Sequence, residues 1–228
     1  MLNRASRFFP ILRAVRSVLT TGGALLEIGS GSLGIGEYWH GAFVGCDVAF
    51  SARPVKNMRA VCCAGQHLPF PDRSFDAVVV SDVMEHVPSL QRRHVVVEAL
   101  RVARKLVVIG YPCGPAAFDL DQKLLREYQT RNLTPPAWLA EHMLHPFPDE
   151  SLLLDLPSGW KREVIPNESL QFRDWMMKAE MFRLSDYSFR LALRLVPRLV
   201  ENLLRRADEE PSYRKIFVLS REAQEEYA

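Results

Sequence analysis

Apolar residues in the first half of the chain form short runs that are separated by polar or glycine-containing segments. Five runs are predicted to be strands, and they cover residues 24–28, 42–47, 60–64, 75–81 and 106–109. The run from Phe75 to Ser81 is apolar on both faces, which is typical of a parallel sheet covered on both sides. A helical pattern over 89–104, with Ser89 as its N-cap, separates the last two strands. This alternation predicts a doubly wound α/β fold.

Two amphipathic segments lie near the ends of the chain. Residues 1–23 carry apolar side chains at helical spacing, with arginines between them, and end in a Gly-Gly pair. Residues 189–206 have the pattern of a basic helix interrupted at Pro197. We expect both helices to pack on the protein, the first at its edge. The alternative for each is contact with a membrane surface or with a partner.

Prolines interrupt the pattern after the fifth strand. A helix is predicted over 119–130, and the irregular stretch 114–160 is expected to be an insertion that covers a substrate. Two weaker strands are predicted over 160–165 and 216–219.

The length of 228 residues fits one domain. We divide residues 1–228 into an N-terminal helix, a core over 24–113, the insertion, and C-terminal strands with the basic helix over 161–228. The net charge of +2 shows no excess of basic residues, so nucleic acid is not expected as a partner. The apolar stretches are too short or too charged for a signal peptide or a membrane span.

The four cysteines, Cys46, Cys62, Cys63 and Cys113, lack paired Cys-x-x-Cys spacing. They therefore indicate neither a zinc site nor a disulfide framework. We expect buried thiols, a cytoplasmic location and no metal ion.

A glycine-rich loop directly follows the first predicted strand. It reads Glu-Ile-Gly-Ser-Gly-Ser-Leu-Gly from Glu27 to Gly34. Glycines let the backbone approach a ligand and turn sharply into a helix N-terminus. Asp47 ends the second strand, where a carboxylate can accept hydrogen bonds from both hydroxyls of a ribose. Loop and carboxylate together predict a nucleotide cofactor, and an NAD(P)-dependent oxidoreductase would use them equally well.

Two further motifs flank the fourth strand. They read Leu-Pro-Phe-Pro-Asp-Arg-Ser-Phe-Asp from Leu68 to Asp76, and Ser-Asp-Val-Met-Glu-His-Val from Ser81 to Val87. Combined with the glycine loop, they make residues 24–113 resemble the class I S-adenosylmethionine (SAM) dependent methyltransferases. The resemblance implies a Rossmann-like, mostly parallel sheet of seven strands with helices on both faces, the last strand being antiparallel. It also implies SAM as cofactor and S-adenosylhomocysteine as product.

The resemblance assigns roles to the cofactor site. In that family Glu27 would anchor the loop and hold the methionine amino group of SAM. The other predicted cofactor residues are Gly29, Ser30 and Gly31 in the loop, Asp47 and Val48 at the ribose, Ala64, Gly65 and Gln66 at the adenine, Ser81, Asp82 and Val83 at the methionine end, and His86 packed on the cofactor. The sequence departs from the family at Ala64, where an aspartate is usual. The segments after the first and second strands are also too short for full helices.

The predicted activity is methyl transfer to a small-molecule, lipid or glycan-precursor acceptor. An in-line displacement at the sulfonium needs mainly alignment of the acceptor. If the acceptor is a hydroxyl, the candidate general bases are His142 and His145 of the insertion, with structural or solvent-facing histidines as the alternative. His86 is a further candidate, for which packing on the cofactor is favoured over helix capping and proton transfer. The second hypothesis is a degenerate SAM-binding module with a regulatory or scaffold role.

Overall fold

The computed structural model describes residues 2–19, 22–181 and 183–222. Its elements, in chain order, are α1 (Leu2–Val18), β1 (Leu25–Ile28), the 3-10 helix η1 (Gly34–Glu37), β2 (Phe43–Asp47), β3 (Met58–Cys62), β4 (Phe75–Ser81), α2 (Ser89–Val102), β5 (Ala103–Pro112), α3 (Gly114–Thr130), α4 (Ala137–Glu141), the 3-10 helix η2 (Glu150–Leu153), β6 (Trp160–Ser169), α5 (Leu170–Glu180), α6 (Arg183–Leu195), α7 (Pro197–Arg206) and β7 (Ser212–Arg221).

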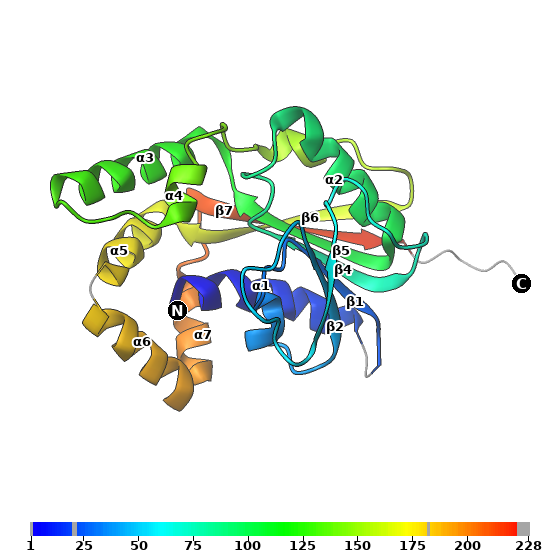
Figure 1. The fold of residues 1–228 in the computed structure, drawn as a ribbon, viewed down its shortest axis with the longest axis horizontal. Coiled ribbons are helices and arrows are strands. Elements are labelled where there is room, and N and C mark those ends of the chain that lie inside the picture. Colours follow the sequence, from blue (N-terminus) through cyan, green and yellow to red (C-terminus); the bar gives the residue numbers. More distant parts are fainter. Residues whose placement is uncertain (1, 20–21, 182, 223–228) are drawn as a thin grey trace, which may run out of the picture.

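The strands form one sheet in the order β3-β2-β1-β4-β5-β7-β6 (Figure 1). Neighbouring strands from β3 to β5 are parallel, whereas β7 runs antiparallel to both β5 and β6. The mostly parallel, seven-stranded sheet with an antiparallel last strand is thereby confirmed. The chain order reverses between β1 and β4, which is where ligands bind in doubly wound sheets.

The two faces of the sheet are covered by different helices. In β4, Val78 and Val80 join the apolar cluster that contains α2, while Ala77 and Val79 join the cluster that contains α1. Because side chains alternate along a strand, the apolar run of β4 requires a helix on each side. Figure 1 shows α1 and α2 on opposite sides of the central strands.

The N-terminal helix does not lie at the edge of the protein, where we had expected it. Phe8 and Ile11 are buried against side chains of β4 and β5, near the middle of the sheet. The physical reason lies in the trimmed segment between β1 and β2, which contains only η1 and leaves that face of the sheet to α1. Residues 48–57, between β2 and β3, likewise contain no helix.

The remaining helices gather at one end of the sheet (Figure 1). They pack around a third apolar cluster, whose buried members are Leu2, Ala5, Leu124, Leu139, Met176, Met177, Val200 and Leu204. Among the described residues, no helix combines the length and the apolar character that a bilayer crossing requires.

Several local boundaries differ from the predictions: α3 begins at Gly114 and not at residue 119, α6 begins at Arg183 and not at residue 189, and β5, β6 and β7 are each longer than predicted. The third strand lies over Met58–Cys62, two residues earlier than predicted, so Ala64 is in the following loop. Pro88 holds the N-cap position of α2 and has no side-chain acceptor, so Ser89 is the first helical residue and not the N-cap that the sequence predicts. Helix α5 was not predicted, although Ser169 caps it by accepting from the Phe172 amide.

Candidate active site

The glycine loop turns where the sequence predicts a turn. Gly29, Gly31 and Gly34 have φ angles of 72°, 52° and 48°, in the left-handed region that favours glycine. A Cβ atom on Gly29 would lie 2.2 Å from Cγ2 of Val83, in the segment after β4. Glycine at this position therefore lets the loop contact the end of the neighbouring strand.

Glu27 supports this loop from inside the protein. Its Oε2 accepts a hydrogen bond from the Ile35 amide at 2.8 Å, and a Cβ atom on Gly34 would lie 2.1 Å from the same oxygen. Burial raises the pKa of Glu27 to about 7, although the Ile35 amide and Arg7 favour the charged form. The side chain is positioned to anchor the turn between β1 and η1.

Asp47 ties the loop to the end of β2. Its Oδ2 accepts a hydrogen bond from the Gly31 amide at 2.8 Å, and its Oδ1 lies 3.5 Å from the amide nitrogen of Ala49. The carboxylate therefore faces the turn at the carboxyl ends of two adjacent parallel strands.

A cavity of about 440 Å³ opens beside this carboxylate. It lies at the carboxyl ends of β1, β2 and β4, and its size is within the usual range for small-ligand sites. The predicted cofactor residues that line it are Gly29, Asp47, Val48, Gly65, Gln66, Asp82, Val83 and His86. Residues from four separate segments of the sequence are thus brought to one site.

Other predicted cofactor residues do not line this cavity; they are Glu27, Ser30, Gly31, Ala64 and Ser81. Ala64 lines a neighbouring hollow together with Gln66, whose side-chain nitrogen donates to Oε1 of Gln91 at 2.8 Å. The two hollows share Gln66, so this amide lies where an adenine edge would be expected.

Sequence reasoning missed several lining residues, namely Ile28, Cys46, Cys63, Val87, Pro88, Val95 and Glu141. Most are apolar neighbours of predicted residues, and their position at a strand end could have indicated them. Glu141 ends α4 in the insertion, and no local motif points to it.

Only Cys46 is a buried thiol as predicted. Cys62 is exposed, while Cys63 and Cys113 are half-buried. The exposed position arises because the third strand lies at the edge of the sheet. Burial raises the pKa of the Cys113 thiol to about 12, which keeps it protonated.

Asp82, at the end of β4, is held by two arginines. Arg214 of β7 donates from Nε to Oδ1 at 2.7 Å and from Nη2 to Oδ2 at 2.9 Å, and Arg7 of α1 donates to Oδ2 at 2.8 Å. Burial alone would raise the pKa of Asp82, but the arginines outweigh it and hold that pKa well below its usual range.

The same arginine continues the network into the protein interior. Arg214 also donates to Oε1 of the buried Glu168 at 2.9 Å, and Arg173 lies 3.2 Å from the other oxygen of that carboxylate. Glu168 further accepts from Ser6 of α1. Helix α1, β6, α5 and β7 are therefore joined to the cavity wall by buried ion pairs.

Glu85, in the same segment as Asp82, is in a different environment. It is fully buried, and neither of its carboxylate oxygens has a hydrogen-bond partner among the described residues. Burial, and then the nearby charge of Asp82, raise the pKa of Glu85 well above its ordinary value.

The candidate bases His142 and His145 lie in different surroundings. His142 is buried, and its Nδ1 lies 2.6 Å from Oδ2 of Asp121, while its ring contacts that of His86 at 5.1 Å. His145 is half-buried. Neither lines the cavity, whereas His86 does, with its Nδ1 3.2 Å from Oε2 of Glu141. Burial and His142 lower the pKa of His86, against the effect of Glu141.

A family model described as "Methyltransferase domain" matches residues 26–109. No curated protein matches the chain in sequence. Residues 26–109 therefore match a methyltransferase domain, as the motifs predict.

Solved structures of methyltransferases share the fold. Phosphoethanolamine N-methyltransferase 2 of Haemonchus contortus, crystallised with phosphomonomethylethanolamine and S-adenosylhomocysteine, superposes with a TM-score of 0.51 at 16% identity over 93% of this chain and 52% of that one. The chain thus spans about half the length of that enzyme. A proposed sarcosine dimethylglycine methyltransferase from Galdieria sulphuraria superposes with a TM-score of 0.54 at 14% identity, covering 96% of this chain and 86% of that one.

Proposed function

We propose that the protein transfers the methyl group of SAM to a small molecule, a lipid or a glycan precursor, and that SAM binds in the cavity between the ends of β1, β2 and β4. The observation that carries the proposal is the convergence of Gly29, Asp47, Asp82 and His86 on that cavity.

The packing of α1 on β4 and β5 supports treating residues 1–228 as a single domain.

Each part of SAM has a matching group along the cavity. The ribose hydroxyls would donate to Asp47, whose Oδ1 makes only a long contact with the Ala49 amide. The adenine would lie by Gly65 and Gln66, and the side-chain amide of Gln66 would replace the carboxylate that the family usually has in place of Ala64. The methionine end would lie by Asp82 and Val83.

The acceptor would approach from the side of the insertion. Glu141, at the end of α4, lines the cavity next to His86. Methyl transfer requires the acceptor atom to lie in line with the sulfonium methyl, so positioning by this wall is the main catalytic contribution we assign to the protein. A general-base role for His142 or His145 stays a prediction.

We also propose that α6 and α7 contact an anionic membrane surface. The exposed apolar side chains of the two helices are Leu191, Leu195, Leu199 and Leu203, and Val196 between the helices is also exposed. Arg194 and Arg198 are exposed among them. Leucines that insert at the headgroup boundary and arginines that meet lipid phosphates suit a peripheral helix. Sedimentation with phosphatidylserine vesicles should retain the protein, and a Leu199→Ser, Leu203→Ser variant should lose that binding.

A degenerate SAM-binding module is the second candidate. It is favoured by Ala64 and by the absence of a helix in residues 48–57, which leaves less structure around the cofactor. Such a module would bind SAM without methylating any acceptor.

The test is isothermal titration with SAM and S-adenosylhomocysteine. We expect micromolar binding that Asp47→Ala weakens by about 100-fold, because two charge-assisted hydrogen bonds are lost. Asp72→Ala is the matched control, since it removes an exposed carboxylate that pairs with Arg101 on the surface. Absence of binding by the intact protein would contradict the proposal. Binding followed by a failed acceptor screen would favour the degenerate module.

A further inference from the structure

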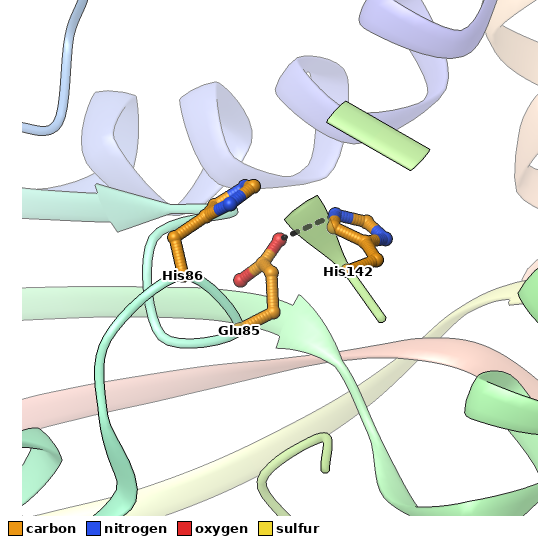
Figure 2. A group of neighbouring side chains, drawn as sticks. All are labelled: Glu85, His86 and His142. Atoms are coloured by element: carbon orange, nitrogen blue, oxygen red, sulfur yellow. Dashed lines mark ion pairs between the residues drawn. The ribbon is translucent and has the colours of Figure 1, made fainter. Parts of the chain in front are cut away.

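We propose that Glu85, His86 and His142 bind a divalent transition-metal ion at the edge of the cavity. One ligand atom from each residue lies within 4.8 Å of the other two. Figure 2 shows how the three side chains are arranged. Two imidazoles and one carboxylate are a ligand set that suits Zn²⁺ and Fe²⁺. This site goes beyond the SAM site and was not predicted from the sequence, where the cysteine spacing alone argued against a metal.

The first argument is the buried carboxylate of Glu85. Both oxygens lack a hydrogen-bond partner in the described part of the chain, and the side chain has no exposed surface. Burying such a group without a partner is costly, and proteins compensate buried carboxylates by protonation, by pairing or by metal coordination. The nearest basic ring nitrogen, Nε2 of His142, lies 3.9 Å away, which is too far for a hydrogen bond.

The second argument is the orientation of His142. Its Nδ1 lies 2.6 Å from Asp121, and the same carboxylate oxygen accepts a hydrogen bond from the Tyr213 hydroxyl at 2.8 Å. With Nδ1 donating to Asp121, the lone pair of Nε2 points toward Glu85. A carboxylate that fixes a histidine in this way is the usual outer support of a metal ligand.

The third argument is spacing. Two atoms bound to one tetrahedral ion at about 2.0–2.2 Å lie about 3.4 Å apart. The 3.9 Å between Nε2 of His142 and Oε1 of Glu85 needs only a small side-chain movement to reach that separation. Two facing groups that both carry lone pairs repel each other unless a proton or a metal cation lies between them.

The position of the cluster distinguishes this site from a structural one. His86 lines the cavity, while Glu85 and His142 are buried behind it. Three protein ligands would leave a coordination position open, as in catalytic zinc sites, whereas structural sites use four. Glu141, 3.2 Å from Nδ1 of His86, would orient that ring.

The test is direct metal binding by the full chain, purified without a histidine tag and stripped with chelator. Titration with Zn²⁺ should give one ion per chain, and Glu85→Gln and His142→Gln should each weaken binding by about 100-fold or more. Asp121→Asn should weaken it by about 10-fold, the lower end of outer-shell effects. His94→Gln, on the exposed side of α2, is the matched control and should leave binding unchanged.

Cobalt substitution identifies the ligands independently of SAM binding and turnover. Co²⁺ should give visible absorption without a thiolate charge-transfer band, and Zn²⁺ should raise the melting temperature of the wild type but not of Glu85→Gln. No zinc binding, equal binding by the Glu85→Gln and His142→Gln variants, or a thiolate band that Cys63→Ser removes would each overturn the proposal. These results do not depend on the methyltransferase assignment, which the SAM titration tests separately.

Discussion

Asp82 and Glu85 lie in the same segment after β4, yet their carboxylates are in opposite situations. Asp82 receives three hydrogen bonds from Arg7 and Arg214, and its pKa lies well below the usual range. Glu85 has no hydrogen-bond partner for either oxygen among the described residues, and its pKa is raised. Burial disfavours charge at both positions, but the arginines bonded to Asp82 lower its pKa, whereas the charge of Asp82 adds to burial in raising the pKa of Glu85. Asp82 is therefore built into the structure, whereas Glu85 is left available for a ligand.

The largest expected effect comes from removing the arginine that Asp82 shares with Glu168. Arg214→Met should lower the free energy of unfolding by about 3–5 kcal/mol, because it leaves two buried carboxylates without their main partner. Urea denaturation at pH 7 measures this loss. Arg104→Met, at a half-exposed surface ion pair, is the control and should cost less than about 1 kcal/mol. Equal losses in the free energy of unfolding for Arg214→Met and Arg104→Met would contradict the claim that Arg214 stabilises the buried carboxylates.

Glu27 is intermediate between Asp82 and Glu85, because its buried carboxyl has one hydrogen bond, from a backbone amide, and a pKa of about 7. Its ordinary pKa is 4.5, so between about pH 4.5 and 7 the folded chain holds a proton that the unfolded chain has released. The free energy of unfolding should therefore fall as the pH rises through this window, by about 3 kcal/mol in total, and stay level above it.

Urea denaturation at several pH values measures this slope. Glu27→Gln should remove most of it, because an amide does not titrate, while Asp72→Asn should retain it. An unchanged slope in Glu27→Gln would mean that the buried carboxyl does not take up a proton on folding.

Arg7 contributes the third hydrogen bond to Asp82 and is itself about one-fifth exposed. Arg7→Met should cost about 1–2 kcal/mol, less than Arg214→Met, because Asp82 keeps two hydrogen bonds and water can reach it. The same denaturation experiment ranks the two variants. A loss as large as that of Arg214→Met would show that α1 holds the carboxylate as strongly as β7 does, which would contradict this ranking.

The smallest effect is expected for Glu85. In metal-free protein, Glu85→Gln should change the free energy of unfolding by less than about 1 kcal/mol, since no hydrogen bond is lost and the shape is kept. Chemical denaturation in the presence of chelator is the measurement. A loss of several kcal/mol would indicate a structural partner for Glu85 and would remove the contrast with Asp82.

The sequence predicted those residues of the candidate site that depend on local chemistry. Gly29 and Asp47 were recognisable because a tight turn and a strand-end carboxylate each leave a short motif. The pairs of Asp82 could not be predicted, because Arg7 and Arg214 are distant in sequence and carry no motif of their own. For the same reason His142 was recognised as a histidine of interest but not as a neighbour of Glu85.

In the fold, too, elements with a local sequence pattern were predicted, and elements that depend on distant residues were not. Continuous apolar runs identified β1, β2 and β4, whereas the bounds of β3 were shifted because its position at the sheet edge weakens the apolar pattern. Helix α5 was missed because its apolar face is buried against other helices and is interrupted by Arg173, which pairs with Glu168. A charged residue that is buried in a tertiary ion pair interrupts the apolar pattern, so a helix that contains it is not predicted from hydrophobic periodicity.

The pairing of Asp82 with Arg214 has a consequence during synthesis of the chain. The two residues are 132 positions apart, so at 5–20 residues per second the ribosome needs roughly 10 s to deliver the arginine after the aspartate. Until then β7 cannot insert beside β5, and the apolar stripe of α1 covers an incomplete sheet. The nascent chain should therefore present aggregation-prone surface for most of its translation, and chaperone capture should depend on how late β7 emerges.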